Sequence, residues 1–277
     1  MENLEMTKKG KLYSLFHRFL CCFPNKEKDN EELDLELHIN SENDNTNKYS
    51  DIINGIQSFF PIMYLREDEK NYFQFTQDFI INFISELSQK NFINKYKENS
   101  LNLSILEKNE LSNTPTIRCE IIRKKSLFKK QVPTLEQLIY PIIIPELRIK
   151  WDQNFKEFEL VRTINENTHI ARSVSTYQLT MIPEREFYEK RTFFFDNGVF
   201  YYFCSSIPDY LYPPKKEPVR VTNYLGALII KEDNENFYID SFNQVDIKMN
   251  VPEVLIVMSF PWKMKEFFDG FIELFNK

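Results

Sequence analysis

Glycine, cysteine and net positive charge are all scarce in this chain of 277 residues. With only 5 glycines, the sequence has no glycine-rich loop of the kind that cradles phosphates. The 4 cysteines have no C-x-x-C spacing, which indicates neither a metal site nor a disulfide framework and favours a reducing compartment. A net charge of -6 argues against a nucleic-acid partner, because the phosphate backbone attracts a positive surface.

Long apolar runs are also lacking. The N-terminal stretch KLYSLFHRFLCCFP is shorter than the ~20 residues of a membrane-spanning helix, and His17 and Arg18 interrupt it. No small-residue cleavage site follows it, so we expect a cytoplasmic location. Residues 1–24 instead suit a short interfacial helix on an anionic membrane, with Cys21 and Cys22 as candidate acylation sites. The alternative is a disordered N-terminus.

Residues 25–50 differ in composition from the rest of the chain. They are rich in Asn, Glu, Asp and Lys and contain no aromatic residue before Tyr49. Such a stretch cannot bury enough apolar surface to order itself, so we interpret it as an acidic disordered linker. The folded part is therefore expected to cover residues 51–277, with no second break and no internal repeat.

Aromatic residues, in contrast, are abundant, at 15% of the chain with 26 Phe. This is more ring surface than an ordinary domain of this size carries. It indicates that the folded part lines or fills a wide apolar space.

Helical and strand patterns follow one another in an α+β order. Phe75, Phe79, Phe83 and Leu87 recur every four residues and predict an amphipathic helix. After it we expect two strands (101–108 and 116–125), two short helices beginning near Thr134 and Pro145, a run of strands from 155 to 246, and a long helix over 251–277.

The stretch RTFFFDNGVFYYFCSSI, residues 191–207, contains the strongest turn signal. Asn197 and Gly198 tolerate the positive φ that a tight hairpin requires. Strand alternation then places Phe187, Glu189, Arg191, Phe193 and Phe195 on one face. Because a buried arginine needs a partner, Arg191 on this apolar face is either a ligand-binding group or half of a core ion pair with Glu189 or another carboxylate.

Five motifs resemble those of START (StAR-related lipid-transfer) domains, in the same order along the chain. They are IKWDQNFKEFELV (149–161), PEREFYEKR (183–191), EPVRVTNYLGALII (217–230), VDIKMNVPEVL (245–255) and SFPWKMKEFF (259–268). Two positions depart from the family pattern, with Glu186 in place of Asp and Met249 in place of Gly. The resemblance extends over nearly all of residues 51–277.

The resemblance implies a helix-grip fold, in which a curved antiparallel sheet wraps around the long C-terminal helix and leaves a tunnel for one lipid. It implies a monomer that binds a phospholipid, sterol or ceramide, exchanges it at a membrane surface and needs no cofactor. Arg191 aligns with an arginine inside the family's tunnel, where a guanidinium pairs well with phosphate. Ser173 replaces an acidic residue of sterol-binding members, so we favour a phospholipid. The ligand-binding residues expected are Arg191, Arg172, Ser173, Tyr177, Phe187, Phe193, Phe195, Tyr201, Phe203, Trp262 and Phe268.

The Trp-Asp pair of the first motif and one strand arginine have a structural interpretation instead. Trp151 and Asp152 are expected to pack and to cap or pair, and Arg220 is expected to form an internal ion pair.

Membrane contact is expected at two places. Leu179, Met181 and Ile182 lie in the loop that gates the tunnel in the family. Leu127 and Phe128 lie in the basic stretch RKKSLFKK, which suits an anionic surface. The alternative in both places is an ordinary solvated loop.

Catalysis is the less favoured function, although helix-grip relatives include hydrolases and cyclases. His169 is the one histidine of the folded part, and Cys204 lies among apolar residues that raise a thiol pKa. We therefore expect a lipid carrier that is not an enzyme, with a lipid-sensing regulatory module as the alternative.

Overall fold

A computed structural model describes residues 76–98, 100–106, 114–175, 183–249 and 253–276. The chain divides into two units, and the first of them, 1–43 with 177–183, lies almost wholly outside these residues. The expectations for residues 1–24 and 25–50, for Cys21 and Cys22, and for Tyr177, Leu179, Met181 and Ile182 therefore also lie outside them. The described helices and strands all belong to the second unit, residues 44–176 and 184–277.

An antiparallel sheet dominates the described residues. Its strands are β1 (Ile93–Glu98), β2 (Leu101–Leu106), β3 (Thr116–Lys124), β4 (Phe155–Asn165), β5 (Thr168–Ser175), β6 (Arg185–Asp196), β7 (Val199–Ser206), β8 (Val219–Arg220), β9 (Thr222–Glu232) and β10 (Asn236–Asp246). Their order is β1-β2-β3-β10-β9-β7-β6-β5-β4, while β8 pairs in parallel with the start of β6. The sheet is open, with β1 and β4 at its edges.

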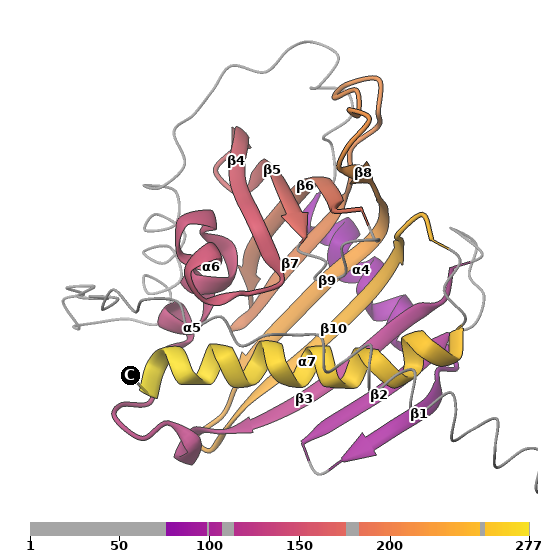
Figure 1. The fold of residues 1–277 in the computed structure, drawn as a ribbon. Helices are drawn as coiled ribbons and strands as arrows, with labels where there is room; N and C mark the ends of the chain where they lie inside the picture. The colour runs from indigo at the N-terminus through magenta and orange to yellow at the C-terminus, as the bar shows by residue number, and fades with distance from the viewer. Residues whose placement is uncertain (1–75, 99, 107–113, 176–182, 250–252, 277) are drawn as a thin grey trace, which may run out of the picture. The chain divides into compact units, whose positions relative to one another are not determined.

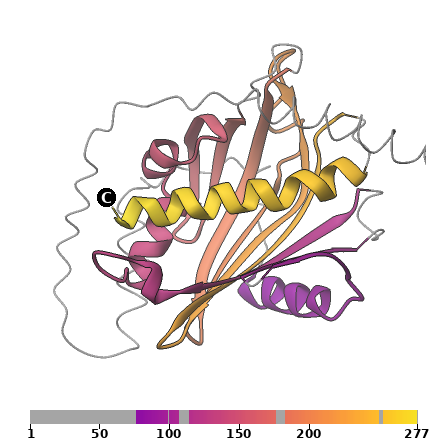
Figure 2. The same ribbon diagram turned by 60° about the horizontal axis from the view of Figure 1, so that its bottom comes forward.

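Helices lie on both faces of this sheet. They are α4 (Gln77–Ser88), α5 (Leu135–Ile143), α6 (Pro145–Trp151) and α7 (Glu253–Asn276), with a short 3-10 turn η1 (Lys125–Leu127). The yellow α7 crosses one face in Figure 1, and Figure 2 shows the indigo α4 on the opposite face. This arrangement confirms the α+β helix-grip prediction.

The hairpin between β6 and β7 forms as its sequence predicts. Asn197 and Gly198 both have positive φ, at 48° and 77°. Asp196 pairs with Val199, so the loop has only two residues. This short loop fixes the register of both strands.

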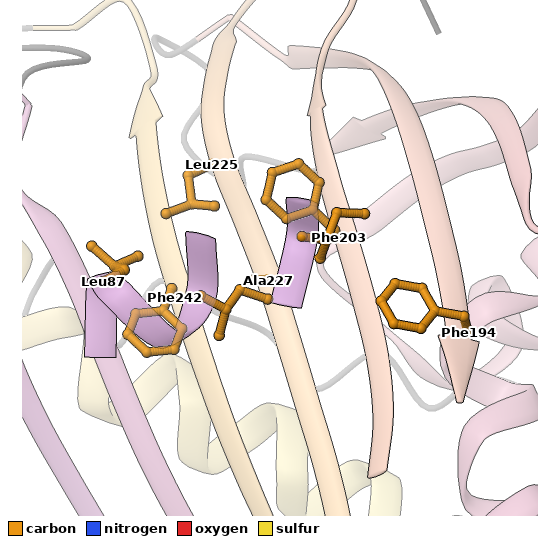
Figure 3. Packing of buried hydrophobic residues seen from close by; sticks show 8 residues of the cluster. Leu87, Phe194, Phe203, Leu225, Ala227 and Phe242 are labelled. Carbon is orange, nitrogen blue, oxygen red and sulfur yellow. The ribbon is translucent and has the colours of Figure 1, made fainter. Parts of the chain in front are cut away.

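The face under α4 is filled by apolar side chains. Ile80, Ile84 and Leu87 of α4 are buried against Phe194, Phe203, Leu225, Ala227 and Phe242 of the sheet, and Figure 3 shows this cluster. The predicted stripe of phenylalanines on α4 is partly wrong, because Phe79 is 47% exposed. The isoleucines, one position further on, carry the contact instead.

The C-terminal half of α7 is fixed by aromatic contacts. Trp151 lies 5.0 Å from the ring of Phe267 and 5.3 Å from that of Phe271, measured between ring centroids. The Trp151 ring N–H donates to the Pro141 carbonyl at 2.8 Å, and Asp152 pairs with Arg148 at 2.6 Å. Both residues of the Trp-Asp motif therefore have the structural role expected of them.

Candidate functional site beneath the C-terminal helix

One row of paired residues crosses the sheet on the face toward α7. It runs from Arg191 through Cys204, Gly226 and Asn243 to Ile117 and Ile105. Ile105 and Ile117 pack with Phe260 of α7, which identifies the face. Since paired residues on neighbouring strands point the same way, Arg191 also points toward the α7 side.

A buried ion pair lies on this face. Arg191 donates from Nη2 and Nε to Oε2 of Glu189, at 2.7 Å and 3.1 Å, and both residues are 5% exposed or less. Burial opposes the charge on Arg191, but Tyr202 and Glu189 outweigh it, so the pKa of Arg191 is raised. The guanidinium carbon also lies 4.3 Å from the centre of the Phe158 ring, within cation–π range.

Asn223 completes the polar cluster. Its Nδ2 donates to the second carboxylate oxygen of Glu189 at 2.6 Å, and Cys204 Sγ lies 3.5 Å from the same nitrogen. Both oxygens of Glu189 are thus occupied. The Asn223 carbonyl oxygen, in contrast, has no hydrogen-bond partner among the described residues.

Two hydroxyls nearby are also buried without a partner. Ser173 is fully buried at 0% exposure and Thr163 is 3% exposed, and neither side-chain oxygen is hydrogen-bonded within the described part of the chain. Ser173 pairs with Phe187 and Thr163 with His169, so both lie on the face of Arg191. A buried polar atom without a partner costs about 1–3 kcal/mol, which a ligand hydrogen bond can recover.

The histidine and the cysteine on this face are poor candidates for catalysis. Burial, with a smaller effect of Arg191, lowers the pKa of His169 to about 3. Burial and Glu189 raise the pKa of the Cys204 thiol far above neutrality, as its apolar surroundings predict. The imidazole is thus a weak base, and the thiol is not a nucleophile at pH 7.

Gly226 leaves room for the side chains of Cys204 and Asn223, because it has no Cβ. A Cβ at position 226 would lie 2.3 Å from Cys204 Sγ and 3.1 Å from Asn223 Nδ2. The first distance is too short for a contact, so any side chain at position 226 would require the Cys204 sulfur to move. Within the described residues, no group of His, Cys, Asp and Glu is arranged to hold a metal ion.

Four of the predicted ligand-binding positions lie on the same face of the sheet as Arg191. Ser173, Phe187, Phe193 and Phe195 share its face through strand pairing and alternation. Phe268 is buried on α7, with the Arg123 guanidinium carbon 5.9 Å from the centre of its ring. The side chain of Trp262 lies outside the described residues.

Three predicted positions lie on the opposite face and must be corrected. Phe203 and Tyr201 pack in the α4 cluster. Since Asp196 pairs with Val199, odd residues of β6 pair with even residues of β7, and Phe193 pairs with Tyr202 instead of Tyr201. The sequence-based choice of odd residues on both strands was therefore wrong for β7.

Arg172 is the third correction. It follows Ala171 and precedes Ser173, so alternation directs it away from them. There it donates to Glu186 at 2.5 Å and to Glu157 at 2.6 Å. Arg220 pairs with the same Glu186 at 2.7 Å, which confirms the expected internal ion pair.

Sequence reasoning missed Asn223 and Thr163. Asn223 directly precedes the mainly apolar stretch 224–230 of β9, which was the available signal, whereas Thr163 lies in the mixed sequence of β4 and gave none. Their approach to Glu189 and His169 follows from strand register, including an extra residue in β9, Tyr224, opposite Gln244 and Val245 of β10.

The two predicted membrane contacts, Leu127 and Phe128, differ in their exposure to solvent. Leu127 is 48% exposed, but Phe128 is 7% exposed and packs edge-on against Phe237 and Phe275. Phe128 is therefore a core residue in this structure and not a surface contact. No described helix combines the length and apolarity needed to cross a membrane.

The open antiparallel sheet with α7 across one face is the helix-grip arrangement. A family model of the START domain matches residues 126–269, just over half of the chain. The chain therefore belongs to the START domain family. No curated protein matches it.

Solved structures share this fold at low identity. Human STARD10 has a TM-score of 0.60 at 16% identity, over 72% of this chain and 80% of that one. Human StAR-related lipid transfer protein 5 has a TM-score of 0.59 at 18% identity, over 72% and 94%. A STAR-related lipid transfer protein fragment from Xanthomonas axonopodis has 0.53 at 11%, over 68% and 100%.

Proposed function

We propose that this chain encloses one lipid between the α7 face of its sheet and α7 itself, and exchanges that lipid at membranes. Family membership and the names of its structural neighbours, which are lipid transfer proteins, support this proposal. The observation that carries it is the set of unpartnered buried oxygens around the Glu189–Arg191 pair. Buried polar atoms without a partner, on a face that also presents Phe187, Phe193 and Phe195, suit an amphipathic ligand.

The energetics of a lipid ligand are consistent with this site. Each methylene removed from water contributes about 0.8 kcal/mol, so two acyl chains of about sixteen carbons contribute roughly 25 kcal/mol gross. Only an extended apolar enclosure can compensate for the loss of the bilayer. The aromatic side chains provide such a surface at small entropic cost.

A net-neutral phospholipid is the cargo that the ion pair favours. Glu189 and Arg191 together carry no net charge, so an anionic head group would leave an uncompensated negative charge in a buried place. A zwitterionic head group avoids this, because its phosphate can approach Arg191 while its own ammonium keeps the head group neutral.

The test compares two arginine variants. Arg191→Leu is expected to abolish most transfer of phosphatidylcholine between donor and acceptor vesicles, because it removes the phosphate partner. Arg172→Leu removes an arginine of the opposite face and is expected to leave transfer unchanged. Unchanged transfer by folded Arg191→Leu protein would refute the head-group role.

Native mass spectrometry of the purified chain tests the carrier itself. A single co-purifying phospholipid is expected. A bound lipid that is never transferred would favour the sensing module, and conversion of the bound molecule would indicate an enzyme. A chain that is empty and binds no lipid would overturn the proposal.

A further inference from the structure

The turn after β3 combines positive charge with exposed aliphatic side chains. We call residues 124–132 the basic turn. Residues 121–135 contain five Lys and Arg residues and no acidic one. Lys124, Lys129 and Lys130 are exposed, and between them Leu127 and Val132 are 48% and 41% exposed.

The basic turn is held in place from below. Phe128 is buried between Phe237 of β10 and Phe275 of α7. The backbone N–H of Lys129 donates to Asn276 at the end of α7, at 2.8 Å. Lys125 pairs with Glu232 at 2.8 Å. Because this underside is anchored, Leu127 is presented outward at little further cost in conformational entropy.

Two of the three acidic residues of the neighbouring β9–β10 hairpin are already engaged in other contacts. Glu232 is paired with Lys125. Asp233 accepts the Tyr238 hydroxyl at 2.7 Å and the backbone N–H groups of Glu235 and Asn236. These bonds lower the pKa of Asp233, with Tyr238 contributing most, and keep it within its own hairpin. Glu235 is the remaining acidic residue of that hairpin.

We propose that the basic turn is a docking surface for an anionic lipid bilayer. Lysines at the rim are attracted to anionic head groups, while Leu127 and Val132 enter the interface between head groups and acyl chains. A nucleic acid would use the lysines but would gain nothing from two exposed aliphatic side chains. The inference rests on the proposed function for its purpose, but docking is measured without lipid transfer.

A reporter at the turn tests the proposal directly. Cys21 and Cys22 are replaced by serine in the full chain, and Leu127→Cys is labelled with an environment-sensitive dye; Cys119 and Cys204 are buried. Vesicles of phosphatidylcholine with phosphatidylserine are expected to shift its emission to the blue, and pure phosphatidylcholine is not. The label reports on its own site whichever part of the chain recruits the membrane.

Tyr210→Cys provides the matched control, because Tyr210 is 73% exposed on the loop between β7 and β8. It is expected to show no shift. An equal shift at both sites, or none at position 127, overturns the proposal. A shift produced equally well by poly-glutamate would also overturn it and would indicate an acidic protein partner.

Charge removal gives the second measurement. Lys129→Gln with Lys130→Gln is expected to weaken flotation with anionic vesicles roughly 30-fold, at about 1 kcal/mol for each lysine. Lys215→Gln with Lys216→Gln removes two exposed lysines elsewhere and is expected to have no such effect. Equal effects of both pairs would show non-specific attraction and refute a defined surface. Normal phosphatidylcholine transfer by a turn variant would leave the proposed function intact.

Discussion

The two faces of the sheet are built from alternate residues of the same strands but differ in kind. Beneath α4, apolar side chains such as Phe194 and Phe242 fill the space (Figure 3). Beneath α7, Glu189 and Arg191 are buried together, and the oxygens of Ser173, Thr163 and Asn223 have no partner among the described residues. A face that is fully packed stabilises the fold, whereas unsatisfied polar atoms are retained where a ligand can use them.

The contrast is clearest along β6. Phe194 belongs to the α4 cluster, while Arg191 and Phe193 lie on the other face. One strand thus contributes to stability with even residues and to the candidate site with odd ones. Substitutions on the two faces should therefore have different consequences.

The largest loss of stability is expected from the α4 face. Phe194→Ala should lower the free energy of unfolding by about 3–5 kcal/mol, because the residue is 1% exposed and the cavity cannot collapse fully. Urea denaturation measures this. Phe195→Ala, at a half-buried position on the other face, is the control. Equal losses would mean that both faces are packed alike.

Breaking the ion pair should lower the free energy of unfolding by nearly as much as Phe194→Ala does. Glu189→Gln leaves Arg191 charged and buried, and should reduce stability by about 3 kcal/mol. Replacing both residues, as Glu189→Leu with Arg191→Met, should recover most of that loss while lipid transfer stays abolished. If the double variant is as unstable as the single one, the pair serves the fold and not a ligand.

Lys190 provides a third test of how the two faces differ, because it is a buried cation on the α4 side of β6. It is 1% exposed, and burial lowers its pKa to about 7 from a usual 10.5. Between these values the unfolded chain binds more protons, so stability rises with pH from about 7 to 10.5. Lys190→Met should be more stable by on the order of 1–2 kcal/mol at pH 7.

The advantage of Lys190→Met should shrink as the pH is raised toward 10. Thermal unfolding of both proteins across this range measures the difference, in which other titrating groups cancel. A difference that does not change with pH would show that the Lys190 pKa is ordinary.

The smallest change in stability is expected at Ser173, on the α7 face. Ser173→Ala removes a buried hydroxyl without a partner, and should raise stability by up to about 1 kcal/mol while weakening lipid binding. Ser241→Ala is the matched control, because Ser241 donates to the Cys119 carbonyl at 3.5 Å on the same face. A loss of stability in Ser173→Ala would argue against a reserved polar site.

Much of the fold could be predicted from local patterns. The Asn197–Gly198 turn, the order of helices and strands and the alternation along β6 depend only on neighbouring residues, and all are found. β1 was missed because its sequence, INKYKE, is polar and mostly exposed at a sheet edge. Strand patterns are recognised by buried alternation, which an edge strand need not have.

The candidate site was only partly predictable. Arg191 and its partner Glu189 follow from alternation along one strand, and the pair was one of the two expected alternatives. The faces of Tyr201 and Phe203 could have been derived from the two-residue loop, which pairs odd with even positions. The contact of Asn223 with Glu189 could not, because it joins β9 to β6, which are separated by β7 in the sheet and by 34 residues along the chain.

The close approach of Gly226 to Cys204 has a consequence for how such chains can diverge. A Cβ at position 226 would come within 2.3 Å of the Cys204 sulfur, so the two positions share one volume. Homologues with alanine or a larger residue at position 226 should carry glycine or alanine at position 204. Positions 204 and 226 are therefore expected to change together. A substitution that enlarges the space beside the ion pair must come first at position 204, because a side chain at position 226 would collide with the Cys204 sulfur.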